Sequence, residues 1–397
     1  MPATNTATSY GSVTRTFHWL TALLILTAFP LGIIANGLPF ETAEQLNQKA
    51  VLFSAHKTVG ILAFLIGVAR IVWALTQAHV VPLHPDRSVQ TWAASVAHWV
   101  LYISLVLVPL SGWLHHAATE GFAPVWLPFG DDLPFVPKNV AVAEFFAGWH
   151  FVFTKILGLA VLAHIAGALK HHVMDRDDTL RRMLGSAEGG PADYRHTRGP
   201  LVGALAIWAV ALAGGTALGL TMHHEGPATP ALEAVASDWA VQDGSIGFTV
   251  IQMGGEVEGQ FADWTAVIAF DPDATEGEAG SVEVTMSVPS VTVGSVTDEA
   301  LKPEFFDAET HPTATYAGTL MVEEGQYRSE GTLTLRGTEA PVNFPFDLTV
   351  EGDTATMSGS VTLQRLDFGV GAASYQDDGT VGLEVVVNLA VTATRSQ

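Results

Sequence analysis

Five long apolar segments constrain the fold of this chain more than any other feature of its sequence. A helix rises about 1.5 Å per residue, so about 20 apolar residues are needed to cross the hydrocarbon core of a bilayer. Five segments have this length and composition: residues 17–36, 52–76, 92–116, 146–172 and 200–222. The first has a long apolar run and no clean small-x-small cleavage site after it, which argues against a signal peptide. We therefore predict five transmembrane helices.

The basic residues between these segments predict an orientation, because cytoplasmic loops of membrane proteins carry an excess of Lys and Arg. One side of the membrane would hold Arg15, Arg87, Arg176, Arg181, Arg182, Arg195 and Arg198, and the other Lys49 and Lys138, with Lys57 close by. The N-terminus is therefore predicted in the cytoplasm. Five crossings then place the C-terminal part on the outer side, which is the periplasm if the membrane is the inner membrane of a Gram-negative bacterium.

The composition changes after residue 225. Residues 226–397 hold 5 Lys and Arg against 27 Asp and Glu, so this part carries the whole formal charge of −22. Such a surface repels nucleic acid and anionic membranes, which argues against both as its partners. Its strands alternate polar and apolar residues, and in residues 381–395 one face collects Val381, Leu383, Val385, Val387, Leu389 and Val391. Short strands of this kind predict an antiparallel barrel or sandwich, and a barrel of about eight strands can hold one small apolar ligand.

Histidine is the residue type that points to a cofactor. The chain contains no cysteine, which excludes disulfides, thiolate metal sites, iron–sulfur clusters and covalent c-type haem. Fourteen of the fifteen histidines lie in the first 225 residues, among the apolar segments. An ionisable ring placed in hydrocarbon is costly and is seldom found there without a role.

The fourth apolar segment has the most informative spacing. Residues 148–175 read GWHFVFTKILGLAVLAHIAGALKHHVMD, with four histidines. His150 and His164 are fourteen residues apart, which is about 21 Å along a helix and returns to nearly the same face. One helix thus presents two imidazoles, one near each membrane surface, as two stacked haems require. Matching depths pair His56 with His150 on the periplasmic side and His18 with His164 on the cytoplasmic side.

Two histidines per iron leave no open coordination position, so such a haem transfers electrons rather than binding oxygen, and without cysteine it is b-type. The alternative for each histidine taken singly is a hydrogen bond to a neighbouring helix. His171 and His98 are rivals for the cytoplasmic haem. The remaining histidines at segment ends are expected to be interfacial: His115, His116, His172, His223 and His224.

Two cations near the predicted ligands are candidate partners for haem propionates. Arg70 lies near the cytoplasmic end of its segment, and Lys57 follows His56. A cation within an apolar helix costs about 3 kcal/mol on insertion scales unless it finds a partner. For Arg70 the alternative is a lipid phosphate reached by snorkelling.

Residues 10–185 resemble the bacterial cytochrome b561 family. The matching text is TFHWL around His18, SAHKTVGIL around His56, AHWVLYISL around His98, and WH-x13-H ending in LKHH on the fourth segment. The resemblance implies a diheme membrane protein that exchanges electrons with ubiquinone, with axial ligands at His18, His56, His150 and His164. It also implies a quinone-site histidine at His171. Members of this family can act as superoxide oxidases, and a similar haem core is the membrane subunit of some hydrogenases and formate dehydrogenases.

Residues 237–396 resemble the YceI-like periplasmic lipid-binding family. The matching stretches are SDWAVQDGSIGFTV, FDPDATEGEAGSVEVTMSVPSV, LKPEFFDAETHPTATYAG, GTLTLRGTEAPVNFPF and RLDFGVGAAS. The resemblance implies a lipocalin-like antiparallel barrel that holds a polyisoprenoid, such as a quinone tail, in an apolar tunnel. The alternative is that the inner face is only a packed core.

These observations predict a multidomain chain with an all-α haem bundle followed by an all-β barrel. The predicted parts are a diheme domain at 1–185, a cytoplasmic loop and fifth transmembrane helix at 186–225, a linker at 226–236 and the barrel at 237–397. The expected activity is electron transfer through two haem b groups between a periplasmic donor, superoxide being one candidate, and ubiquinone. The alternatives are a membrane-anchored isoprenoid carrier without redox activity and a cytochrome subunit of an unseen dehydrogenase.

Overall fold

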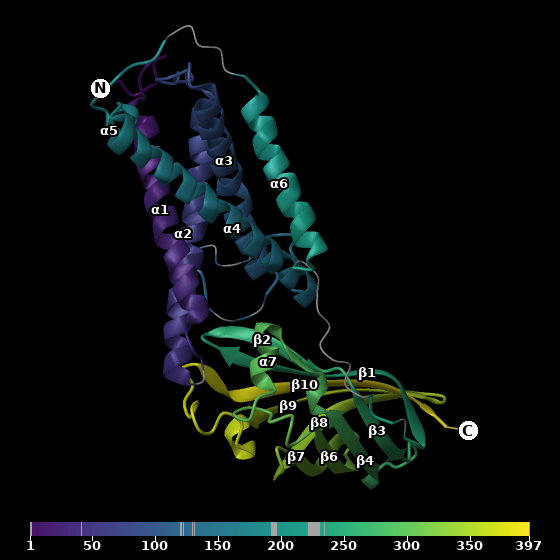
Figure 1. The fold of residues 1–397 in the computed structure, drawn as a ribbon. Coiled ribbons are helices and arrows are strands. Elements are labelled where there is room, and N and C mark those ends of the chain that lie inside the picture. Colours follow the sequence, from purple (N-terminus) through teal and green to yellow (C-terminus); the bar gives the residue numbers. More distant parts are fainter. Residues whose placement is uncertain are drawn as a thin grey trace. The chain divides into compact units, whose positions relative to one another are not determined.

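The chain folds into two compact units, one helical and one made of β-strands. The computed structural model describes residues 2–40, 42–119, 121, 123–128, 130, 132–191, 197–220, 231–233 and 235–396. Most of the predicted linker at 226–236 lies outside these residues. Figure 1 shows the helices of the first unit and the curled sheet of the second.

The helical unit contains five helices that are long and apolar enough to cross a membrane, as the sequence predicts. Among the described residues these are α1 (Ser12–Gly37), α2 (Ala43–Leu75), α3 (Ser88–Ala117), α4 (Val140–Lys170) with the π-helical turn η1 (His171–Asp175), and α6 (Gly199–Ala217). The short helix α5 (Thr179–Leu184) follows η1. The chain is therefore a membrane protein.

The first four helices begin four to nine residues before the predicted segments, because their first turns are more polar than the apolar cores from which the segments were read. The start of α4 shows how such a helix begins. The side chain of Asn139 accepts a hydrogen bond of 3.0 Å from the backbone N–H of Val142, which satisfies one of the donors left free at a helix N-terminus. The predicted fifth segment ends at residue 222, whereas α6 ends at Ala217 and turn residues follow it.

Small residues allow α6 to approach α3 and α4 closely (Figure 1). A Cβ atom on Gly203 would lie 2.9 Å from the ring of Trp92 on α3, and one on Gly215 would lie 3.1 Å from Val152 on α4. Trp208 is buried between them, with its ring 5.2 Å from that of Phe153. Close backbone contact between small residues is the usual basis of helix packing in membranes, where burial of apolar surface supplies no driving force.

The β unit is one antiparallel sheet of ten strands, in the order β3-β4-β6-β7-β8-β9-β10-β1-β2-β5. The strands are β1 (Trp239–Gln252), β2 (Gly255–Phe261), β3 (Trp264–Phe270), β4 (Gly277–Ser287), β5 (Val291–Val293), β6 (Thr313–Glu323), β7 (Gln326–Leu335), β8 (Thr338–Glu351), β9 (Thr354–Gln364) and β10 (Val381–Arg395). Short helical turns η2 (Val288–Ser290), η3 (Gly294–Val296), α7 (Thr297–Ala300) and η4 (Arg365–Phe368) join some of them. The predicted all-β fold is confirmed.

The sheet curls until its edge strand β3 meets the beginning of β1. The indole N–H of Trp239 donates to the carbonyl of Phe270 at 2.9 Å, and the Ser237 hydroxyl accepts from the backbone N–H of Ile268 at 2.8 Å. The side chain of Trp239 is 2 % exposed, so solvent has little access to its hydrogen bond. Side chains rather than a regular strand ladder therefore join these two parts of the sheet.

The concave face of the sheet is apolar, as the alternation in β10 predicts. Val385 and Val387 pack against the buried cluster around Phe248, and Leu389 packs against the clusters around Tyr316 and Ile246. The intervening residues of β10 are exposed. The prediction that one face of this strand is buried is confirmed.

Arg365 explains why the stretch RLDFGVGAAS has a fixed shape. Its guanidinium is buried and donates to the backbone carbonyls of Val370, Gly382 and Val381, each at 2.9 Å, and also to that of Tyr375. A single planar group with five N–H donors thus holds the loop between β9 and β10. Burial lowers the pKa of Arg365, but a guanidinium stays charged in proteins.

Candidate haem-binding histidines

His56 on α2 and His150 on α4 face each other; they are called the first pair. Their ring centroids are 6.2 Å apart and the ring planes are nearly perpendicular, at 81°. The Nδ1 atom of His56 lies 2.8 Å from the carbonyl oxygen of Ala28, and Nδ1 of His150 lies 2.9 Å from that of Val108. An Nδ1–H that donates to a carbonyl fixes the tautomer and leaves the Nε2 lone pair free to bind a metal.

The two histidines of the first pair contact the same arrangement of backbone groups, which His56 meets on α1 and His150 on α3. Each accepting carbonyl is followed four residues later by a glycine, Gly32 after Ala28 and Gly112 after Val108. A Cβ atom on Gly32 would lie 2.8 Å from the His56 ring, and one on Gly112 would lie 2.9 Å from the His150 ring. Only glycine leaves the ring room to reach the carbonyl. The sequence analysis missed both glycines, although the related stretches AFPLG and VPLSG carry the signal.

His18 on α1, His98 on α3 and His164 on α4 meet at a second place in the helical unit, called the second cluster. The ring centroids of His18 and His164 are 6.0 Å apart, and those of His98 and His164 are 5.2 Å apart. The sequence predicts that His18 and His164 lie close together and names His98 as a neighbour. The structure brings all three rings together.

The ring separations test whether these residues fit a metalloporphyrin. Two imidazoles on opposite sides of one metal, with metal–nitrogen bonds of about 2 Å each, have ring centres about 6 Å apart once the extra ~1 Å from nitrogen to ring centre is added on each side. The first pair at 6.2 Å and the His18–His164 pair at 6.0 Å fit this requirement. The His98–His164 separation of 5.2 Å is too short for it.

The two predicted propionate partners lie near different histidines. Lys57 is buried, at 7 % exposure, and lies close enough to His56 and His116 to act on them electrostatically. Arg70 stands over the ring of Tyr102, 5.2 Å from its centroid, and acts electrostatically on His18, His98 and His164. Each cation thus lies near one of the two sets of histidines, and its role toward a propionate stays a prediction.

The five histidines that the sequence analysis expects to be interfacial differ in their surroundings. His115 and His116 occupy the last turn of α3, where His115 bonds the carbonyl of Ala143 at 2.8 Å and the two rings are 4.5 Å apart. His172 is exposed. His223 and His224 lie outside the described residues.

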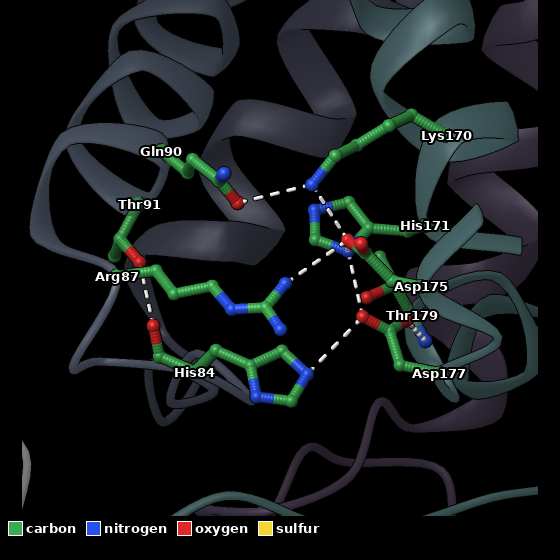
Figure 2. A network of polar contacts seen from close by, with 9 residues as sticks. All are labelled: His84, Arg87, Gln90, Thr91, Lys170, His171, Asp175, Asp177 and Thr179. Atoms are coloured by element: carbon green, nitrogen blue, oxygen red, sulfur yellow. Dashed lines mark hydrogen bonds and ion pairs between the residues drawn. The ribbon is translucent and has the colours of Figure 1, made fainter.

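His171 belongs to a polar network that the sequence does not predict (Figure 2). Its Nδ1 lies 2.6 Å from Asp177 and 3.1 Å from Asp175, and Asp177 also bonds Nε2 of His84 at 3.2 Å. Burial opposes the ionisation of Asp177. Hydrogen bonds from Thr179 and His171 outweigh that effect and lower the pKa of Asp177 to about 2.

A groove with a volume of about 580 Å³ opens between α1 and α5. Its walls are formed by Ser12, Arg15, Thr16, Trp19, Leu20, Leu23, Met183 and Leu184. The indole N–H of Trp19 donates to the carbonyl of Met183 at 3.1 Å and ties the two helices together. The groove is mostly apolar with one cation, and it lies beside His18, whose ring contacts that of Trp19.

Comparisons with known proteins agree with this division of the chain. Residues 9–186 match the family model described as prokaryotic cytochrome b561, and residues 239–393 match that of the YceI-like domain. Cytochrome b561 homolog 2 of Escherichia coli (strain K12) is 32% identical over 195 residues, which is 49% of this chain and 99% of the relative. A Yersinia pestis protein named probable superoxide oxidase CybB is 26% identical over 182 residues, 45% of this chain and 98% of that protein.

Among solved structures, BcnA of Burkholderia cenocepacia is similar to the β unit. It is 29% identical, with a TM-score of 0.36, over 38% of this chain and 96% of that protein. The matches over 9–186 and 239–393 correspond to the helical and β units. The chain belongs to the prokaryotic cytochrome b561 family through its helical unit, and its β unit is a YceI-like domain.

Proposed function

We propose that the helical unit binds two b-type haems and transfers electrons between a periplasmic donor and ubiquinone. His56 and His150 would hold one haem, and His18 and His164 the other. The observation that carries this proposal is the separation of the two ring pairs, 6.2 and 6.0 Å, at two places joined by α4. Haem supplies reversible one-electron chemistry when it is held by two histidines.

Different residues would orient the axial imidazoles and neutralise the haem propionates. The carbonyls of Ala28 and Val108 orient the imidazoles of the first pair through Nδ1. Lys57 and Arg70 would neutralise haem propionates, one at each site; the burial of Lys57 and its electrostatic effect on His56, and that of Arg70 on His18 and His164, support these roles. A cation that meets an anion there offsets the cost of burying both.

The proposed donor and acceptor come from the family and from the cytoplasmic end of the helices. A relative is named a probable superoxide oxidase, which supports superoxide as the donor. Ubiquinone is the proposed acceptor, at His171 and with the groove beside Trp19 as an apolar surface for its ring or tail. With superoxide as donor the activity is that of a superoxide:ubiquinone oxidoreductase.

The β unit would bind a quinone or another polyisoprenoid in the periplasm. The alternating apolar face of β10, with Val385 and Val387, offers the kind of wall that an isoprenoid chain packs against. A short tether raises the local concentration of such a domain at the membrane into the millimolar range. Lipid extracted from the purified chain should contain an isoprenoid, and its absence would remove this part of the proposal.

A spectrum and a redox titration test the electron-transfer function. The purified chain should show b-type absorption and two haems per polypeptide by the pyridine haemochrome assay. Superoxide should reduce it, and a water-soluble ubiquinone analogue should reoxidise it. A colourless protein would favour the alternative in which the helices only anchor an isoprenoid carrier, and co-purification of a dehydrogenase would favour a subunit role.

A further inference from the structure

The loop between α3 and α4 folds back onto the helical unit. Its two ends meet where the backbone N–H of Asn139 donates to the carbonyl of Ala118 at 2.9 Å. Its middle returns to α2, where the backbone N–H of Trp126 donates to the hydroxyl of Thr58 at 3.0 Å. The loop therefore has a fixed position against α2, beside the residues that follow His56.

Thr58 shows how deep this contact lies. It belongs to the apolar segment 52–76 and lies about 3 Å further along α2 than His56, away from the start of the helix. Val51 and Leu62, on α2 before and after it, are exposed, as lipid-facing residues of a membrane-spanning helix are. The backbone of Trp126 thus lies beside the membrane-spanning part of α2.

The residues around Trp126 suit a place at the edge of a bilayer. Residues 124–130 read PVWLPFG and carry no charge. Pro124 and Pro128 have no backbone N–H, and that of Trp126 is bonded, so fewer backbone donors need a partner there. Irregular backbone close to hydrocarbon needs this economy, because lipid tails offer it no hydrogen bonds.

The side chain of Trp126 is not used in the packing of the helices. It is 58 % exposed, although its own backbone is bonded to α2. An indole combines a large apolar ring with one N–H donor, and tryptophan is enriched where a bilayer meets water for this reason. Its exposure at this depth therefore points to lipid as the neighbour.

We propose that the α3–α4 loop is a membrane-contact loop, with the indole of Trp126 inserted between the hydrocarbon and the headgroups of a phospholipid bilayer. The contact needs an apolar surface for the ring and a headgroup oxygen for the indole N–H, so it requires no particular headgroup charge. The bilayer then holds the loop against the part of α2 that carries His56 and Lys57. Neither haem nor quinone takes part in this contact, so it stands apart from the proposed function.

Photo-crosslinking of the full chain in phosphatidylcholine liposomes tests the contact. p-Benzoylphenylalanine in place of Trp126 keeps a large aromatic side chain and, when illuminated, bonds to C–H groups within reach. Mass spectrometry should then find one phospholipid attached to this position. The same replacement at the lipid-facing Leu62 is the positive control, and at Asp132, whose side chain is 80 % exposed on the same loop, the negative one. A crosslink from position 126 to the chain itself, or none while Leu62 yields a lipid adduct, would overturn the proposal.

Hydrogen exchange supplies a second test if the crosslinking variant does not fold. In the same liposomes, Trp126→Ala should speed exchange in residues 124–128 roughly tenfold or more, because the loop loses the apolar contact that holds it down. Trp126→Phe keeps an aromatic ring and should stay close to the wild type. Equal exchange in the wild type and Trp126→Ala would show that the indole does not hold the loop, and the membrane contact would be refuted.

Discussion

The first pair and the second cluster place histidines by different means. In the first pair each imidazole contacts a backbone carbonyl through Nδ1 and lies against a glycine. In the second cluster three rings compete, and we find no hydrogen bond to a ring nitrogen of His18, His98 or His164 among the described residues. A ligand held through its second nitrogen is better oriented and more basic. The comparison predicts a rigid site and an adaptable one on the same helix.

The largest expected effect is the loss of one haem at a time. If the proposed ligation holds, His150→Ala should remove the haem of the first pair, and His164→Ala that of the second cluster, because each substitution takes away a proposed axial ligand. The haem content measured by the pyridine haemochrome assay should fall from two haems per polypeptide to one in each variant. The exposed His172→Ala is the control and should keep both. Loss of both haems from either single variant would show that the sites are not independent.

The next effect distinguishes two neighbours of His164. His18→Ala should lose the second haem, since His18 and His164 have the separation that two axial ligands need. His98→Ala should keep it, because a ring 5.2 Å from His164 is too close to share the metal from the opposite side. The haem count and the reduced absorption spectrum measure both. If His98 rather than His18 proves indispensable, the pairing drawn here is wrong.

A smaller effect tests whether the first pair needs the glycines against which its rings lie. Gly32→Ala puts a methyl group 2.8 Å from the His56 ring, and overpacking of this kind costs about 1–3 kcal/mol. We expect roughly 10- to 100-fold faster loss of the first haem to a competing apoprotein, with the second haem unaffected. Gly60→Ala on α2 is the matched control, because a Cβ atom there meets no neighbour within 4 Å. Equal rates of haem loss in the two variants would contradict the claim that Gly32 leaves the room that the His56 ring needs.

The periodicity of the sequence predicts those features of the molecule that follow from regular helix and strand geometry. The five long helices, the buried face of β10 and the approach of His56 to His150 and of His18 to His164 follow from helix and strand geometry. The Arg365 loop, the π turn at His171 and the link from Asp177 to His84 do not, because they depend on backbone conformations and on contacts between distant residues. Gly32 and Gly112 lie between these two cases. Each follows a Pro-Leu pair within two residues in the sequence, but only the ring contacts show why a glycine is needed there.

The smallest effect concerns Ser111, whose hydroxyl lies near His150 of the first pair. Its hydroxyl donates to the carbonyl of Val108 at 2.8 Å and lies 3.4 Å from Nδ1 of His150, so it competes with the ring for the same acceptor. Ser111→Ala should strengthen the bond from His150 to that carbonyl, make the imidazole a better electron donor and favour the oxidised haem. Since the geometry changes little, about 0.5 kcal/mol is expected, which lowers the midpoint potential of that haem by about 20 mV. A redox titration resolves this shift, with Ser104→Ala on the same helix as the control, because Ser104 bonds only its own helix through Val100. A rise in potential instead would mean that the hydroxyl supports the ring rather than competing with it.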